Sequence, residues 1–299
     1  MTDAPPPFQS RFYSAPDGLR LHMRDYGPRD SAALPVVCLP GLSRNSADFH
    51  AIAMAIAGGD AGPARRVVAL DYRGRGLSER DPDWKKYDLT IESGDIQSML
   101  AAAGIGEAIF IGTSRGGIHC MLLAAFRPTL MRAVVMNDIG PVLEPRGLAR
   151  IRSYIGKLPS PSHWDDAVAM YKQLFGAHFT GLDDQEWLAY AQASLEEKDG
   201  RLVARYDPRL MKILENIDLE SPLPDLWPQF EGLRHLPLLI IRGENSDLLT
   251  EETLAQMLAR HGRAEAFTVP GQGHAPLLAE RPSMERICAF IAGIADQTA

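Results

Sequence analysis

The sequence has few cysteines and no long apolar run. Three cysteines, Cys38, Cys120 and Cys288, are spread over 299 residues, and an odd, widely spaced set argues against both a disulfide framework and a paired-cysteine zinc site. We expect these thiols to be buried and unreactive. Nowhere do about 18 apolar residues follow one another, so the sequence predicts no membrane-spanning helix.

The sequence also lacks an excess of positive charge. Its 31 basic and 38 acidic residues give a formal net charge of -7, which offers no general attraction to phosphate backbones or anionic lipids. We therefore expect a small-molecule partner and neither nucleic acid nor membrane insertion. A secretory leader has a basic segment followed by an apolar stretch, and Met1 to Ser10 has no such pattern. The expected location is therefore the cytoplasm.

Short apolar runs alternate along the chain with segments of helical spacing. The runs are too short for helices and rich in β-branched residues, which is typical of strands buried on both faces of a parallel sheet. We expect an α/β fold with a mostly parallel central sheet, helices on both faces and an antiparallel hairpin at its start. The predicted strands are residues 11–14, 19–26, 36–39, 67–70, 108–111, 133–136, 238–241 and 266–269, and the predicted helices are residues 47–57, 91–103, 117–126, 251–260 and 282–294.

The alternation stops after Asp138 and resumes at Leu238. Between them the sequence contains helix starts but no run typical of a buried strand. Because the two halves of the sheet cannot bury their faces separately, we expect one core of residues 1–140 and 237–299 that carries an inserted helical cap of residues 141–236. Aromatic residues of the cap either form its own core or line an apolar pocket. They are Tyr154, Trp164, Tyr171, Phe175, Phe179, Trp187 and Tyr190.

Gly112-Thr113-Ser114-Arg115-Gly116 forms a G-x-S-x-G pattern between a predicted strand and an apolar helix. The pattern alone is weak, but strand, turn and helix are the context of a nucleophile elbow. In such an elbow the serine occupies a tight, strained turn, and the helix N-terminus favours developing negative charge. We therefore predict that Ser114 is a nucleophile; the alternative is an ordinary glycine-rich turn.

A serine hydroxyl needs a general base, and the base needs a partner that fixes its tautomer. Of the eight histidines, His274 alone lies in a loop beyond a late strand. Asp247 lies beyond the strand 238–241, at the edge where open α/β sheets place their sites. We predict His274 as the base and Asp247 as its carboxylate, with a helix cap as the alternative role of Asp247. No pair of histidines has metal-ligand spacing, so we expect no metal or cofactor.

Acyl transfer also needs donors for the developing oxyanion, usually backbone N–H groups. One candidate is the amide of Arg115, directly after the nucleophile. The second is the amide of Leu42, because Pro40-Gly41-Leu42 follows the strand 36–39 with a glycine turn; the alternative is a simple strand-ending turn. The side chain of Arg115 either reaches a substrate carboxylate or pairs with an acidic neighbour and holds the elbow.

These segments together resemble the α/β-hydrolase superfamily, from about Phe12 to Ile291. The order Ser, Asp, His along the chain is the one found in that family, and the insertion is similar to its variable helical cap. Asp71 to Ser78 is similar to the family's D-x-R-G-x-G-x-S segment, a structural signature. Pro40 stands where the family's His-Gly element has histidine, so any role of that side chain is absent.

The resemblance implies a serine hydrolase. Haloalkane dehalogenases and the related epoxide hydrolases use an aspartate at the elbow, so Ser114 argues against both. Some relatives place the triad acid where Asp138 lies, which makes Asp138 the alternative to Asp247. We expect hydrolysis of a carboxylic ester or lactone of a small, apolar substrate through an acyl-enzyme. The alternatives are carbon–carbon bond hydrolysis of a dienoic keto acid and a ligand-binding sensor that keeps the triad; the substrate and the oligomeric state are not specified.

Overall fold

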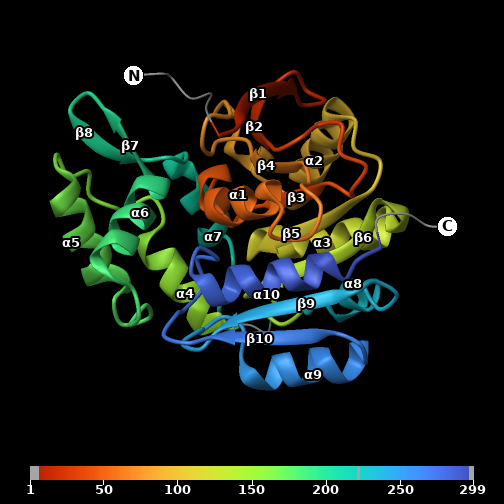
Figure 1. Cartoon of the computed structure of the whole chain (residues 1–299). Coiled ribbons are helices and arrows are strands. Elements are labelled where there is room, and N and C mark those ends of the chain that lie inside the picture. Colours follow the sequence, from red (N-terminus) through yellow and green to blue (C-terminus); the bar gives the residue numbers. More distant parts are fainter. Residues whose placement is uncertain (1–6, 221–222, 296–299) are drawn as a thin grey trace.

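The computed structural model describes residues 7–220 and 223–295 and has one eight-stranded sheet as its centre (Figure 1). The strand order is β1-β2-β4-β3-β5-β6-β9-β10. β2 pairs antiparallel with β1 and β4, and the other pairings are parallel. Residues 1–6, 221–222 and 296–299 of the predicted core and cap lie outside the described part. The strands are β1 (Gln9–Ser14), β2 (Arg20–Tyr26), β3 (Val36–Leu39), β4 (Val67–Asp71), β5 (Ala108–Thr113), β6 (Met131–Asn137), β9 (Leu238–Gly243) and β10 (Glu265–Val269).

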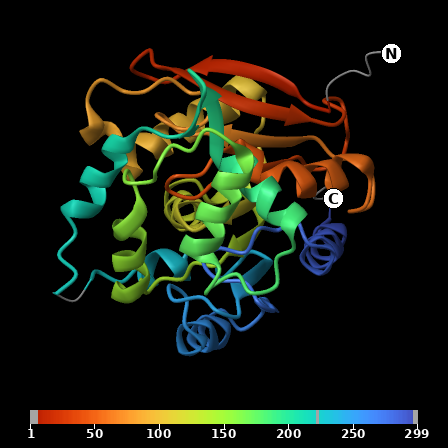
Figure 2. The same ribbon diagram turned by 90° about the vertical axis from the view of Figure 1, so that its left-hand side faces the viewer.

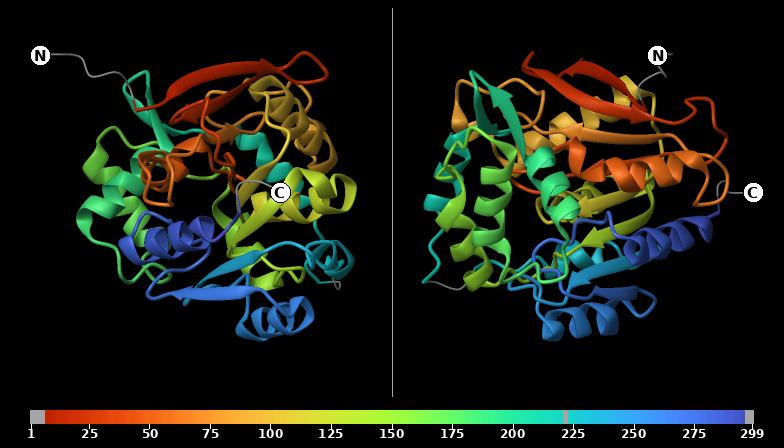
Figure 3. Two further views of the ribbon diagram at one scale, coloured as in Figure 1. Left: turned by 45° about the vertical axis from the view of Figure 1, so that its right-hand side comes forward. Right: turned by 60° about the vertical axis from the view of Figure 1, so that its left-hand side comes forward.

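Side chains of the central strands alternate between two apolar layers, as the two-residue period of a strand requires. On β5, Ile109 and Ile111 face the layer formed with α1 and α10, whereas Phe110 faces the layer formed with α2, α3, α8 and α9. Figure 3 shows helices on both sides of the sheet. The predicted fold class is therefore confirmed. The helices are α1 (His50–Gly58), α2 (Leu89–Ala103), α3 (Arg115–Phe126), α8 (Trp227–Glu231), α9 (Glu251–His261) and α10 (Arg281–Ala292), with short 3-10 turns η1 (Ser46–Phe49), η2 (Trp84–Lys86) and η3 (Pro128–Leu130).

The segment between β6 and β9 lies across the carboxyl ends of the parallel strands and is nearest the viewer in Figure 2. It is not wholly helical, because it contains the antiparallel hairpin β7-β8. β7 reads Leu-Glu-Glu-Lys and is mostly exposed, so it lacks the apolar run by which strands were predicted. The elements are α4 (Pro145–Tyr154), α5 (Trp164–Phe175), α6 (Asp184–Ser194), β7 (Leu195–Lys198), β8 (Arg201–Ala204), η4 (Pro208–Leu210) and α7 (Met211–Glu215).

α8, the last helix before β9, packs with the core although it falls within the predicted cap. Phe230 of α8 belongs to the same apolar cluster as Phe110 of β5. Tyr171, Phe175 and Trp187 instead form a separate cluster on α5 and α6. We propose that the cap ends before α8.

All three cysteines are buried and free, as expected. Burial raises the pKa of the Cys38 and Cys120 thiols, and it raises the pKa of Cys288 to about 11. At neutral pH these thiols are therefore poor nucleophiles. None of the helices in the described part of the chain is long and apolar enough to cross a membrane.

Candidate active site

Ser114 lies on the turn between β5 and α3. Its backbone has φ 50° and ψ -112°, and such a positive φ costs a non-glycine residue about 1–3 kcal/mol. The N–H of Ser114 donates to the carbonyl of Asn137 at the end of β6 (2.9 Å), so the neighbouring strand holds the turn. The strained turn matches the geometry expected for an elbow and presents the serine at the carboxyl edge of the sheet.

The glycines of the elbow are required because backbone segments pass close to them. A Cβ at Gly116 would lie 2.0 Å from the Leu39 carbonyl oxygen of β3. A Cβ at Gly112 would lie 2.6 Å from the backbone of Gly116. The glycines of the G-x-S-x-G pattern are therefore a consequence of the close approach of α3 to β3 and β5.

Replacing Gly116 by alanine is expected to lower the free energy of unfolding by more than about 2 kcal/mol, because the new methyl group would overlap the Leu39 carbonyl. Gly94→Ala is the matched control. A Cβ at Gly94 in α2 meets nothing within 4 Å, and alanine in a helix interior stabilises by up to about 1 kcal/mol. Urea unfolding of both variants measures the difference; equal midpoints for Gly116→Ala and the parent would contradict the close approach.

His274 and Ser114 are brought together across 160 positions of sequence. The Ser114 Oγ lies 2.9 Å from His274 Nε2, and His274 Nδ1 lies 2.9 Å from Asp138 Oδ2. Because an ionised carboxylate only accepts hydrogen bonds, Nδ1–H donates to Asp138 and the Nε2 lone pair faces the serine hydroxyl. In this tautomer an imidazole can remove the proton of a serine.

Asp138 is fully buried and surrounded by donors. It follows β6 directly with φ 56°, a conformation that aspartate adopts more readily than most residues. Its Oδ1 accepts from the Gly243 N–H (2.8 Å), and its Oδ2 accepts from the Ser246 hydroxyl (2.6 Å) as well as from His274. These hydrogen bonds fix the direction of the carboxylate toward the imidazole.

The structure corrects the prediction that Asp247 orients His274. The carboxylate of Asp247 forms a two-point ion pair with Arg150 of α4, at 2.6 and 2.8 Å. Partial burial alone would raise the pKa of Asp247, but the hydrogen-bonded guanidinium lowers it overall. The carboxylate of Asp247 is thus paired with Arg150, and the carboxylate beside His274 is that of Asp138.

The sequence feature that could have identified Asp138 as the partner of His274 is its position directly at the end of a strand. β6 lies between β5 and β9 in the sheet, so its carboxyl end is adjacent to the strand that carries Ser114. Asp247 lies further out in the loop after β9. Ser246, the residue before Asp247, donates to Asp138 and was not singled out from the sequence.

Leu42 lies in the turn after β3, next to Ser114. A Cβ on Gly41 would lie 3.7 Å from Ser114 Cβ. The N–H of Arg44 donates to the Gly41 carbonyl (3.2 Å), and in a trans peptide the Leu42 N–H points away from that carbonyl. Within the described residues, neither the Leu42 nor the Arg115 amide donates to a backbone carbonyl, which leaves both free for a ligand.

The side chain of Arg115 is buried outside the cavity. Its Nε donates to Glu92 of α2 (2.6 Å), and its Nη2 donates to the Tyr87 carbonyl (3.1 Å). The interpretation in which Arg115 pairs with an acidic neighbour is therefore confirmed. A contact between this guanidinium and a substrate carboxylate has no support in the structure.

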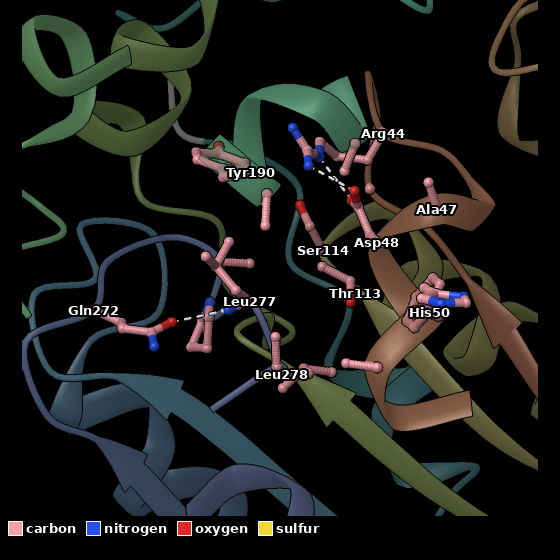
Figure 4. A pocket seen from close by; sticks show the side chains of 18 of the residues that line it. Arg44, Ala47, Asp48, His50, Thr113, Ser114, Tyr190, Gln272, Leu277 and Leu278 are labelled. Atoms are coloured by element: carbon pink, nitrogen blue, oxygen red, sulfur yellow. Dashed lines mark hydrogen bonds and ion pairs between the residues drawn. The ribbon is translucent and has the colours of Figure 1, made fainter. Parts of the chain in front are cut away.

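A cavity of about 450 Å³ opens beside Ser114 and His274 (Figure 4). Its apolar lining comes from both core and cap, as Leu42, Ile151 and Leu277 illustrate. Of the cap aromatics, only Tyr154 and Tyr190 line it within the described residues. The other five pack in the cap's own cluster: Trp164, Tyr171, Phe175, Phe179 and Trp187.

Sequence reasoning missed an ion pair in the cavity wall. Arg44 Nε and Nη2 donate to the two Asp48 oxygens, both at 2.6 Å (Figure 4). The guanidinium lies 4.5 Å from the centroid of the Tyr190 ring, and it also donates to the hydroxyl of Ser194 at the end of α6. Burial alone would lower the pKa of Arg44, but Asp48 raises it. The wall beside Ser114 therefore holds a charged pair with no net charge.

Known proteins with similar sequences and structures are hydrolases. A model of the alpha/beta hydrolase family matches residues 36–285. The 3-hydroxybutyrate-oligomer hydrolase of Cupriavidus necator is 32% identical over 265 residues, which are 86% of this chain and 88% of the relative. The 2-(acetamidomethylene)succinate hydrolase of Mesorhizobium japonicum is 26% identical over 78% of this chain and 79% of the relative. The crystal structure of an alpha/beta hydrolase from Novosphingobium aromaticivorans has a TM-score of 0.85 at 37% identity, covering 96% of this chain and 99% of that one.

Proposed function

The chain belongs to the alpha/beta hydrolase family, whose matched members are hydrolases, and from this premise we propose that it is a serine hydrolase of carboxylic esters. The observation that carries the proposal is the hydrogen-bonded row from Ser114 through His274 to Asp138, which opens on an apolar cavity. In this proposal Ser114 is the nucleophile, His274 the general base and Asp138 the residue that fixes the histidine tautomer.

Acylation proceeds as Ser114 Oγ attacks the ester carbonyl carbon and passes its proton to His274 Nε2. The carbonyl electron pair moves onto oxygen, where the amides of Leu42 and Arg115 donate to the oxyanion. When the intermediate collapses, His274 gives its proton to the departing alcohol. Water then attacks the acyl-enzyme carbonyl while His274 takes a proton from it. When the second intermediate collapses, the acid is released and His274 returns the proton to Ser114 Oγ.

The Arg44–Asp48 pair in the cavity wall supports a neutral substrate at the reacting end. Arg150, which lies outside the lining, is paired with Asp247. Neither cation is free to bind a substrate carboxylate next to the nucleophile. This arrangement favours esters and lactones over the dienoic keto acid, for which Arg115 or a cap arginine would have been the anchor.

The relative from Cupriavidus necator bears the name of a hydrolase of 3-hydroxybutyrate oligomers, and ester bonds between small hydroxy acids suit the size and lining of this cavity. We therefore propose uncharged short-chain esters, alkyl esters of hydroxybutyrate among them, as substrates. Turnover of 4-nitrophenyl butyrate, the methyl ester of a 3-hydroxybutyrate dimer, a lactone and a dienoic keto acid should be compared on the intact protein. Turnover of the keto acid alone would reject the proposal in favour of carbon–carbon bond hydrolysis.

Dimethyl succinate is expected to react with at least tenfold higher kcat/KM than monomethyl succinate, because the second substrate brings an unpaired carboxylate to a wall where Asp48 already pairs with Arg44. In the Asp48→Asn variant Arg44 loses its partner, and the preference for the neutral ester should shrink by about tenfold. Steady-state hydrolysis of both esters by both proteins measures the ratio. An unchanged ratio would show that Arg44 does not face the substrate.

A further inference from the structure

A buried charge cluster lies beneath the catalytic turn. Arg75 follows β4 in the D-x-R-G-x-G-x-S segment, and its Nη1 lies 2.6 Å from Glu92 Oε1, with both side chains wholly buried. The other oxygen of Glu92 accepts from Arg115 Nε at 2.6 Å. Burial alone would raise the pKa of Glu92, but Arg115 and Arg75 hold it well below its usual range. Glu92 is thus an anion that bridges two arginines.

Arg75 also reaches the turn after β3. Its Nε donates to the Leu42 carbonyl (2.8 Å), and its Nη1 donates to the Arg73 carbonyl (2.6 Å). The guanidinium lies 5.6 Å from the ring centroid of Tyr72 and 5.3 Å from that of Tyr87. One arginine therefore connects the Leu42 turn to Glu92, and through Glu92 to Arg115.

These contacts fix two successive peptide groups of the turn. Arg75 holds the Leu42 carbonyl, and the Arg44 N–H holds the Gly41 carbonyl. Since peptide groups are planar, fixing both carbonyls also fixes the direction of the Leu42 N–H between them. At the other end, Glu92 holds the side chain of Arg115, the first residue of α3.

Buried ion pairs add little net stability, because desolvation of the charges offsets their attraction. Such a cluster is better explained by the geometry it imposes. An oxyanion hole is effective only when its donors are in place before charge develops. The two amides that would donate come from different segments, and the Arg75-Glu92-Arg115 chain is the connection between them.

We propose that Arg75 and Glu92 are positioning residues, which hold the amides of Leu42 and Arg115 in one fixed relation around the oxyanion. This inference rests on the proposed function. It assigns to the D-x-R-G-x-G-x-S segment a part in transition-state stabilisation, although no atom of Arg75 lines the cavity.

Arg75→Met keeps an unbranched apolar side chain but removes the guanidinium that donates to the Leu42 carbonyl and to Glu92. We expect kcat for 4-nitrophenyl butyrate to fall by about 30-fold, less than the loss of a whole oxyanion donor, with KM within twofold. Inhibition by a short-chain trifluoromethyl ketone, whose Ser114 adduct carries an oxyanion, should weaken by the same factor. Inhibition by butan-1-ol, which has no carbonyl oxygen for the two amides to bind, should change less than twofold.

Arg73→Lys is the control at the neighbouring arginine, and it matches the exchange Arg75→Lys. Arg73 lies in the same segment, equally buried, and pairs with Asp81 and Asp95 away from the Leu42 turn. We expect this variant to lose thermal stability but to keep kcat and ketone inhibition within twofold. If Arg75→Met does not fold, Arg75→Lys replaces it, because a single ammonium cannot serve Leu42 and Glu92 together as a guanidinium fork does.

Unchanged kcat and ketone inhibition in the Arg75 variant would overturn the positioning role, as would an equal loss of both in Arg73→Lys. These results differ from a failure of the proposed function itself. In that case the unmodified protein would neither hydrolyse the ester nor bind the ketone.

Discussion

Ser114→Ala is expected to reduce kcat for ester hydrolysis by about a millionfold, the loss seen when the nucleophile of a serine hydrolase is removed. The reason is that no other hydroxyl lies within hydrogen-bond distance of His274 Nε2 among the described residues. Stopped assays with 4-nitrophenyl butyrate measure the rate. The variant should fold normally, because alanine only removes the Oγ from a partly exposed position.

A fluorophosphonate probe provides the independent test of the same residue. It should label the unmodified protein at Ser114 and leave Ser114→Ala unlabelled. Undiminished hydrolysis by the alanine variant would remove Ser114 from the reaction. Tight binding of an apolar ligand without labelling or turnover would instead favour the sensor hypothesis.

Asp138→Asn is expected to lower kcat by about 10,000-fold, equivalent to about 5.4 kcal/mol of transition-state stabilisation. An amide has nearly the shape of the carboxylate, so the packing should be kept. Its NH2 group, however, can donate to His274 Nδ1 and would stabilise the tautomer with the proton on Nε2. That tautomer cannot accept the proton of Ser114. Steady-state kinetics of the purified variant measure the loss.

Asp247→Asn is the matched control, because the same exchange is made at the other candidate acid. We expect kcat within about threefold of the parent, since Asp247 pairs with Arg150 and not with His274. A large loss of kcat in Asp247→Asn together with a small loss in Asp138→Asn would reverse the two assignments. Asp247, which the sequence predicted, would then be the carboxylate that orients His274.

Much of the fold could be predicted because its signals are local. The inner strands β3, β4, β5, β6 and β9 each coincide with a short apolar run, since burial on both faces demands apolar side chains. The hairpin β7-β8 of the cap was not predicted, because its first strand lacks such an apolar run. β7 has a single buried residue, Leu195, and its other side chains face outward, so no periodic signal distinguishes it from a polar loop.

The elbow could be predicted from residues that are contiguous in sequence, since a strand, a strained turn and a helix must follow one another there. The acidic partner of Arg115 could not be predicted in the same way. Glu92 lies 23 positions away on α2, and the sequence contains many other acidic residues. The hydrogen bond from Arg75 to the Leu42 carbonyl spans 33 positions. Its acceptor is a backbone atom, which no pattern of side chains in the sequence indicates.

The sequence by itself determined the parallel sheet, the turn that carries Ser114 and the loop that carries His274, because each depends on neighbours along the chain. Only the tertiary structure decided which aspartate faces His274. Asp138 and Asp247 both follow strands that end at the same edge of the sheet. The choice depends on partners distant in sequence: Arg150 of the cap binds Asp247, while Ser246 and Gly243 turn the Asp138 carboxylate toward the imidazole.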